Sequence, residues 1–280
     1  MKCVAGGCDR PMEMFFCPLY SGSSGNALFV QAGQTRVLID AGKPGKTLTE
    51  ALNLIGVEPE SLDAILITHE HSDHIAGAGV MARKYHVPVY ATEDTWAAMD
   101  KKVGAVAPDL RRTFDKKQDF YLGQLGVAPF AIPHDAADPV GYRLWCGSVS
   151  IATATDLGYF SKGVKEAVSG SSLVLLESNH DPDMLMRNPH YSAHLKQRIL
   201  SNHGHLSNEA CANALIQLVE SGVHHVILGH LSGENNLPEL ALQTSENRAE
   251  EAGIRLGHDL SLDMAWRDRV GGVYTLKEGG

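Results

Sequence analysis

The stretch Ala64-Ile65-Leu66-Ile67-Thr68-His69-Glu70-His71-Ser72-Asp73-His74 places four potential metal ligands within six residues, directly after an apolar run. A short apolar run between polar segments is typical of a buried strand. Imidazole nitrogens and carboxylates are good ligands for Zn²⁺, Fe²⁺ or Mn²⁺. Four such groups in six residues cannot all face one way on a helix or strand, whereas on a loop they can converge from two sides. The stretch therefore predicts a metal-binding loop at the end of a strand over 64–68.

Apolar segments on either side of this stretch predict an alternation of strands and helices. Strands are expected at 15–19, 27–32, 37–39, 87–91, 127–132, 140–145, 149–154, 173–176, 226–228 and 273–276. Helical spacing or capping predicts helices at 48–55, 81–86, 95–102, 192–200, 208–221 and 239–252. Each half of the chain has strands first and then a mixture of strands and helices. The two halves share no sequence repeat, and no linker separates them. We expect an α/β fold, with a single domain over residues 15–280 and a flexible leader at 1–14.

Composition restricts the possible partners and the compartment. The 24 Lys and Arg residues against 33 Asp and Glu residues give a net charge of −9, which argues against a broad basic surface for nucleic acid. A local cationic cleft stays possible, because two divalent metal ions would add about four positive charges there. The five cysteines lack zinc-finger pairing and are expected to be reduced thiols. No segment is predicted to span or enter a membrane, no export signal is readable, and we expect a cytoplasmic protein.

Four further residues stand next to predicted strands, as the ligands of a metal centre would. They are Asp40 in Leu38-Ile39-Asp40-Ala41-Gly42, His134 after 127–132, Asp156 after 149–154 and His230 after 226–228. Together with the run from His69 to His74, in this order along the chain, they resemble the motifs of the metallo-β-lactamase fold superfamily. The resemblance extends from about Phe16 to Leu276. It implies a four-layer αββα sandwich.

The resemblance also implies two divalent metal ions, Zn²⁺ or Mn²⁺, with Fe²⁺ permitted by the same ligands. The first ion is assigned to His69, His71 and His134, and the second to Asp73, His74 and His230, with Asp156 as the bridging ligand. Asp40 is implied to orient a ligand imidazole from the outer shell. A metal-bridging hydroxide would be the nucleophile, with Asp73 and Asp156 as catalytic residues.

Three motifs are similar to those of the YycJ/WalJ branch of the superfamily. They are Ser21-Gly22-Ser23-Ser24-Gly25-Asn26, the stretch 176–181 and the stretch 200–208. Members of this branch are double-stranded-DNA 5′–3′ exonucleases, so the resemblance implies a phosphodiesterase with DNA rather than RNA as substrate. A ribonuclease-Z-like RNase, a small-molecule phosphodiesterase and a non-catalytic metal-binding module stay open. The oligomeric state has no sequence signal.

Two groups of polar residues are candidates for substrate contacts. Ser207 or Asn208 is expected to cap the helix 208–221, whose free amides, with His203 or His205, could hold a phosphate. The alternative is that Ser207 or Asn208 only caps the helix. His180 follows a buried strand together with Glu177 and Asp181, and is an extra metal ligand, a leaving-group acid or a core histidine. We take His180 and His205 as catalytic candidates.

Overall fold

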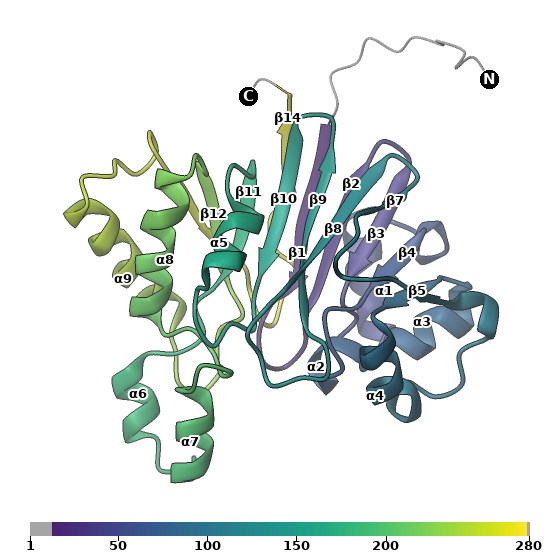
Figure 1. The fold of residues 1–280 in the computed structure, drawn as a ribbon, viewed down its shortest axis with the longest axis horizontal. Coiled ribbons are helices and arrows are strands. Elements are labelled where there is room, and N and C mark those ends of the chain that lie inside the picture. The colour runs from purple at the N-terminus through teal and green to yellow at the C-terminus, as the bar shows by residue number, and fades with distance from the viewer. Residues whose placement is uncertain (1–12, 279–280) are drawn as a thin grey trace.

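Two seven-stranded sheets, stacked face to face with helices on their outer faces, form the computed structural model, which describes residues 13–278 (Figure 1). The first sheet has the order β14-β1-β2-β3-β4-β5-β6. Its strands are β1 (Glu13–Tyr20), β2 (Ala27–Ala32), β3 (Thr35–Ile39), β4 (Ala64–Leu66), β5 (Val89–Ala91), β6 (Arg111–Thr113) and β14 (Tyr274–Lys277). The strands β3 to β6 are parallel, and β14, β1, β2 and β3 pair antiparallel.

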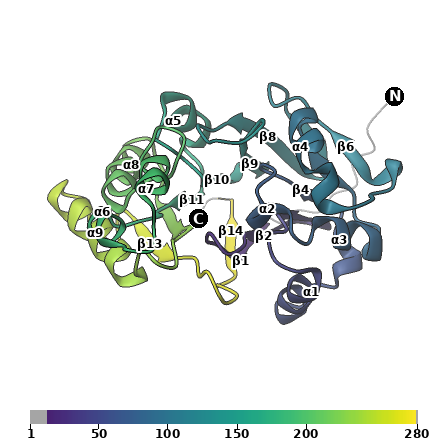
Figure 2. The ribbon, with the colours of Figure 1, turned by 90° about the horizontal axis from the view of Figure 1, so that it is seen from below.

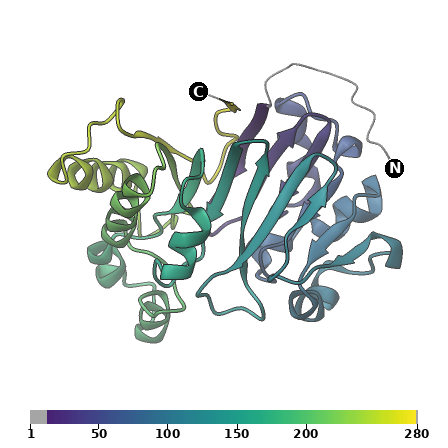
Figure 3. The ribbon, with the colours of Figure 1, turned by 45° about the horizontal axis from the view of Figure 1, so that its top comes forward.

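The second sheet has the order β13-β12-β11-β10-β9-β8-β7. Its strands are β7 (Phe120–Leu122), β8 (Leu125–Ala131), β9 (Val140–Cys146), β10 (Val149–Ala154), β11 (Leu173–Glu177), β12 (His225–Gly229) and β13 (Ser261–Met264). The strands β10 to β13 are parallel. Each of β10 and β11 is buried along its whole length, which explains why most of their residues are apolar. Figure 3 shows strands of this sheet in front of those of the first.

Helices cover the outer face of each sheet. The first half of the chain contributes α1 (Gly45–Leu54), α2 (Ser72–Ile75), α3 (Ala78–Tyr85), α4 (Glu93–Val103) and the 3₁₀ turns η1 (Pro59–Ser61) and η2 (Pro108–Leu110). The second half contributes α5 (Lys162–Val168), α6 (Pro182–Arg187), α7 (Ala193–Ile199), α8 (Asn208–Glu220) and α9 (Pro238–Glu251). From below, α1, α3 and α4 lie on the opposite side of the sheets from α5, α8 and α9 (Figure 2). None of these helices is long and apolar enough to cross a membrane.

Three apolar clusters separate the layers and confirm the expected αββα sandwich. One lies between the two sheets and includes Phe16, Val30 and Leu144. A second joins the first sheet to its helices, and a third joins the second sheet to α5, α8 and α9. Burial of this apolar surface is the main term that holds the four layers together.

Several boundaries differ from the sequence prediction. The structure adds the strands β6, β7 and β13 and the helices α2, α5 and α6 to those expected. These elements are three to seven residues long, too short for a periodic pattern to mark them. The strand β1 starts at Glu13, so Glu13 and Met14 do not belong to a leader. The rest of the expected leader, 1–12, lies outside the described residues, and the single domain over 15–280 stays a prediction.

Candidate metal and active site

The site lies at one edge of the sandwich, where strands of both sheets end. Asp40 follows β3, His69 follows β4, Asp156 follows β10, and His230 follows β12. Since the carboxyl ends of parallel strands meet at the same edge of a sheet, this edge collects residues far apart in the sequence. Three of the four, Asp40, Asp156 and His230, have left-handed backbone conformations, with φ of 59°, 59° and 56°. Such conformations are uncommon outside glycine and cluster at functional sites.

Three histidines form the first candidate metal cluster. His69 Nε2 lies 3.0 Å from His71 Nδ1, and His134 Nε2 lies 3.2 Å from the same atom. In a tetrahedral zinc site with Zn–N bonds of about 2.0–2.1 Å, neighbouring nitrogens are about 3.3 Å apart. The three imidazoles therefore converge closely enough to bind one divalent ion through three nitrogens.

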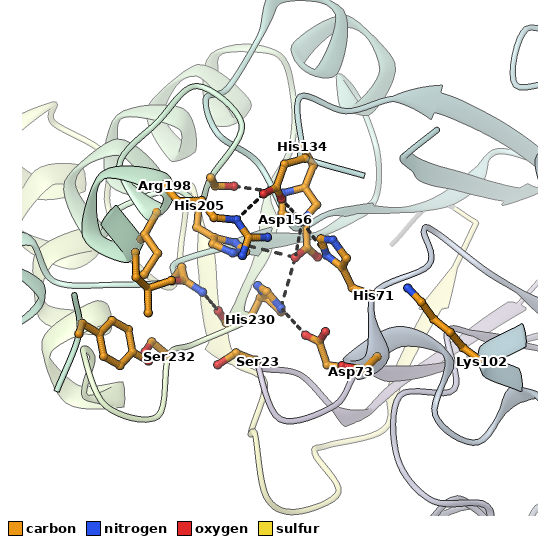
Figure 4. Close-up of a pocket in the computed structure, with 17 residues that line it drawn as sticks. Ser23, His71, Asp73, Lys102, His134, Asp156, Arg198, His205, His230 and Ser232 are labelled. Atoms are coloured by element: carbon orange, nitrogen blue, oxygen red, sulfur yellow. Dashed lines mark hydrogen bonds and ion pairs between the residues drawn. The ribbon is translucent and has the colours of Figure 1, made fainter. Parts of the chain in front are cut away.

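The second cluster contains Asp73, His74 and His230, and Asp156 stands between the two. Asp73 Oδ2 lies 3.6 Å from His74 Nε2 and 3.8 Å from His230 Nε2. Asp156 Oδ2 lies 3.5 Å from His74 Nε2, and its Oδ1 lies 3.7 Å from His134 Nε2. Asp156 thus faces a ligand candidate of each cluster with a different oxygen, which is the geometry of a bridging carboxylate. Figure 4 shows the side chains of Asp73, His134, Asp156 and His230 pointing toward one another.

The donor atoms and their ionisation fit divalent metal ions. Asp156 Oδ2 and His230 Nε2 are buried and hydrogen-bond to no described residue. Burial and the neighbouring imidazoles hold the pKa of His69 well below its usual range, so this ligand is neutral. Burial raises the pKa of Asp73 and Asp156, but His74 and His230 outweigh it and lower both, so the carboxylates are ionised. Neutral imidazoles and ionised carboxylates are the forms that bind metal. His69, Asp73 and Asp156 are in these forms. Burial lowers the pKa of His74 and His230, but the carboxylates outweigh it and raise both, so a metal ion would have to displace a proton there. These residues together could hold divalent metal ions.

Asp40 contacts the ligand candidate His74 through the ring nitrogen that does not face the site. Its Oδ2 lies 2.7 Å from His74 Nδ1, and its Oδ1 accepts the backbone N–H of Thr68 at 2.8 Å. A carboxylate on Nδ1 leaves Nε2 as the atom that faces the site. Burial lowers the pKa of His74, but Asp40, Asp156 and Asp73 outweigh burial and raise it to about 9. The negative field that favours a proton on His74 also favours a cation in front of it.

The turn 21–26 also supports the ligands. Ser21 Oγ accepts the backbone N–H of His230 at 2.9 Å, and Asn26 Nδ2 lies 3.1 Å from His74 Nε2. Sequence reasoning marked this turn as a motif but assigned no contact to it. Such contacts join residues 48 and 209 positions apart, which no local pattern encodes.

Glu177 is a functional candidate whose role sequence reasoning did not identify. Its Oε1 lies 2.8 Å from Nδ1 of His205 and 2.8 Å from Nδ1 of His230. Burial raises the pKa of Glu177, but His205 and His230 outweigh it and lower the pKa, so the carboxylate is ionised. A signal existed in the sequence, because Glu177 is the one charged residue of the otherwise apolar strand β11. His205 is brought to the site: its Nδ1 lies 3.8 Å from Asp156 Oδ1.

The ligand run is not entirely a loop. Ser72–Ile75 forms the single-turn helix α2, so Asp73 and His74 are helical, while His69 and His71 precede it. The expected convergence from two sides is achieved by the change from extended backbone at His71 to helix at Asp73. Four residues are too few for helical periodicity to appear in the sequence.

Four expected substrate or catalytic residues do not reach the site. His180 is 1% exposed, both of its ring nitrogens are without a described partner, and it does not line the cavity. Burial lowers the pKa of His180 to about 4, so its ring is neutral. Ser207 caps α8 by accepting the N–H of Ala210, and the buried Asn208 bonds to Ser178. His203 is exposed and lies outside the cavity lining.

A cavity of about 590 Å³ opens in front of the metal ligands. Its walls include Lys102 of α4 and Tyr191 and Arg198 beside or on α7, none of which the sequence indicated. Lys102 Nζ donates to the backbone oxygen of Glu70 at 3.1 Å, and Arg198 pairs with Asp135. These side chains come from helices whose sequences carry no recognisable site motif, so only the fold brings them here.

Comparison with known proteins agrees with the fold and the site. The family described as "Beta-lactamase superfamily domain" matches residues 35–231. Exodeoxyribonuclease WalJ of Streptococcus pneumoniae serotype 2 is 43% identical over 246 residues, which cover 87% of this chain and 91% of that protein. Exodeoxyribonuclease YycJ of Bacillus anthracis is 39% identical over 251 residues, 90% of this chain and 95% of that protein.

Solved structures of low sequence identity share the fold. The metallo-β-lactamase fold protein YhfI of Bacillus subtilis superposes with a TM-score of 0.71 at 16% identity, over 94% of this chain and 100% of that one. Zn²⁺-bound PqqB of Methylobacterium extorquens superposes with a TM-score of 0.68 at 16% identity, over 92% and 99%. The chain belongs to the metallo-β-lactamase superfamily, in the branch that contains WalJ and YycJ.

Proposed function

We propose that this protein is an exodeoxyribonuclease that uses two divalent metal ions, Zn²⁺ or Mn²⁺, to hydrolyse phosphodiester bonds of double-stranded DNA from a 5′ end. The observation that carries the proposal is a pair of histidine–carboxylate clusters that share Asp156 at the base of an open cavity. Two relatives named exodeoxyribonucleases, similar to this chain over nearly their full length, support DNA as the substrate. The 5′-to-3′ direction follows from the sequence resemblance.

When bound, the two ions would supply an activated water and positive charge for the attacked phosphate. The side chains of this protein hold and orient that centre. His69, His71 and His134 would hold one ion, Asp73, His74 and His230 the other, and Asp156 would bridge them. Asp40 and Glu177 fix the imidazoles of His74 and His230 through Nδ1, so that their Nε2 atoms face the ligand position.

His205 is placed to transfer a proton to the leaving oxygen. Glu177 holds its Nδ1 at 2.8 Å, and the imidazole lines the cavity beside Asp156. The Glu177 carboxylate on Nδ1 fixes the orientation of the ring and leaves Nε2 free to contact the substrate. The pair Glu177–His205 would thus protonate the alkoxide that leaves the cleaved phosphodiester.

The cavity suits a strand terminus. Its volume of about 590 Å³ lies within the ~300–1,000 Å³ of sites that hold small ligands, which is enough for a nucleotide or two. Lys102 and Arg198 in its walls supply positive charge for phosphate oxygens. A cytoplasmic location belongs to the same proposal, and the free thiols of Cys17, Cys146 and Cys211 agree with a reducing compartment.

The test supplies the metal-loaded protein with three substrates in parallel: 5′-end-labelled duplex DNA, RNA of the same sequence and bis-p-nitrophenyl phosphate. We expect release of nucleotides from the duplex ends and little cleavage of the RNA. Elemental analysis should give about two divalent ions per chain. Intact duplex beside rapidly cleaved aryl phosphodiester would assign the protein to the small-molecule phosphodiesterases, and faster RNA cleavage would make it a ribonuclease.

A further inference from the structure

Two cationic side chains that form no ion pair within residues 13–278, Lys43 and Arg267, lie beside the cavity residues Ser23 and Ser232. Ser23 and Ser232 line the cavity next to each other, because a backbone bridge joins Gly22 to Leu231 (Figure 4). The side chain of Arg267 packs against this bridge. Within residues 13–278 the Arg267 guanidinium makes no hydrogen bond and no ion pair.

Lys43 lies beside the same turn. Its Nζ donates to the backbone oxygen of Ser24 at 3.0 Å and lies 3.1 Å from Ser24 Oγ, and it pairs with no carboxylate of the described chain. Burial lowers the pKa of Lys43 and the Arg267 charge lowers it further, while Asp268 partly opposes them. Two positive groups therefore stand within electrostatic reach of each other, and a bound anion would relieve their repulsion.

The backbone of the turn is shaped around these two side chains. A Cβ at Gly25 would stand 2.6 Å from Cδ of Lys43, and a Cβ at Gly22 would stand 2.7 Å from Cγ of Arg267. At Gly233, next to the cavity residue Ser232, a Cβ would collide with the Arg267 guanidinium. Glycine at these three positions lets both side chains lie flat against the main chain.

The turn also offers a main-chain donor. The amide of Ser24 donates to no residue in the described part of the chain, whereas those of Gly22, Gly25 and Asn26 are bonded and that of Ser23 belongs to the backbone bridge with Leu231. A free N–H group beside cationic side chains adds a donor for an anion. The protein as a whole carries a net charge of −9, so this local excess of positive donors is not an average property of its surface.

We propose that Lys43, Arg267 and the amide of Ser24 form a second phosphate-binding subsite, which holds a backbone phosphate of the polynucleotide away from the cleaved bond. This inference rests on the proposed function. The subsite adjoins the side of the cavity formed by Asp73 and His230, whereas Lys102 lies near His71. A strand that fills the cavity would therefore reach it on the side of the second metal cluster.

A phosphate fits these donors better than other anions of similar charge. The planar Arg267 fork can bind two phosphate oxygens, Lys43 neutralises charge as a point donor, and the Ser24 amide can bind a third oxygen. Contacts of this kind position nucleic acid without reading its sequence. The subsite would favour polynucleotides over small phosphodiesters, which are too short to reach it.

The experiment measures binding of the holoenzyme to a fluorescent duplex with phosphorothioate linkages that slow hydrolysis, between 50 and 200 mM KCl, values chosen to cover the range in which phosphate contacts respond to salt. The variants are Arg267→Gln and Lys43→Gln. Arg255→Gln is the matched control, since Arg255 pairs with Asp259 and lies outside the cavity lining. We expect each subsite variant to weaken binding by roughly tenfold and to lower the slope of log Kd against log salt by about one.

Arg267→Lys distinguishes the effect of the positive charge on binding from the effect of the guanidinium geometry. It keeps the charge but not the fork, so it should restore the salt slope and part of the affinity. In turnover, the loss of kcat/KM in Arg267→Gln should be larger on the duplex than on bis-p-nitrophenyl phosphate by about threefold or more. Thermal melts establish that the variants are folded.

Two outcomes would overturn the subsite, and they are distinguishable. If the wild type degrades the duplex while both subsite variants match Arg255→Gln in affinity and slope, the subsite is wrong and the proposed function stands. If the wild type neither binds nor degrades DNA, the proposed function fails, and the subsite fails with it.

Discussion

Oδ2 of Asp40 lies 2.7 Å from Nδ1 of His74, and both side chains are almost completely buried. The two residues are 34 positions apart: Asp40 follows β3, and His74 lies in α2. This contact determines which nitrogen of His74 faces the metal position. It gives the first prediction.

Asp40→Asn keeps the shape of the side chain but removes its charge, so His74 becomes a weaker and less firmly oriented ligand. We expect the affinity for the second metal to fall by about 10–100-fold, as is usual for outer-shell carboxylates. Competition with a fluorescent chelator measures this affinity. Asp109→Asn, an exposed substitution on η2, is the control. Equal affinity in the two variants would show that Asp40 does not support the ligand.

Asp156 combines a metal-facing carboxylate with a left-handed backbone at φ 59°. We expect both Asp156→Asn and Asp156→Ala to lose turnover and metal while staying folded by circular dichroism. Asparagine tolerates the left-handed region better than alanine, so the alanine variant should be less stable by about 1 kcal/mol in urea unfolding. Cys146→Ser should change activity little. Normal turnover in Asp156→Asn would show that another residue bridges the metals.

His205→Ala tests the proton donor. If His205 protonates the leaving oxygen, kcat on duplex DNA should fall by about 10²–10⁴-fold with metal content unchanged. The loss on bis-p-nitrophenyl phosphate should be much smaller, because p-nitrophenolate leaves without a proton. His205 also belongs to a cluster with Asp156, Glu177 and His230 that could hold a metal. Loss of a metal from the variant would therefore make His205 a ligand instead.

Tyr142 gives a prediction on stability. Its ring is fully buried between the sheets, and its hydroxyl donates to the backbone oxygen of Ile67 at 2.6 Å. Tyr142→Phe leaves that buried carbonyl without this partner, so the free energy of unfolding should fall by about 1–3 kcal/mol. Urea denaturation measures the loss, with the exposed Tyr121→Phe as control. Equal stability of the two variants would mean that the bond contributes nothing net.

The sequence alone determined the α/β class and the positions from which metal ligands come, and its resemblance to the metallo-β-lactamase superfamily implied the sandwich. The first two features are local: an apolar run followed by His or Asp marks a strand end, whatever the strand later pairs with. The ligand candidates His69 and His71 could thus be identified beside their strand. Short elements such as β6 and α2 could not, because three or four residues do not contain two full periods of a strand or helix pattern.

Only the tertiary structure decided which polar residues near the strand ends face the cavity. Glu177 contacts His205 and His230, 28 and 53 positions away, while the neighbouring His180 is buried outside the cavity lining. Asn208 was a candidate phosphate ligand because it stands at the start of a helix. In the structure, however, the packing of α8 buries it. Local sequence restricts a side chain to one end of a strand or helix. Which side of that end faces solvent depends on the layers packed around it, and these come from distant parts of the chain.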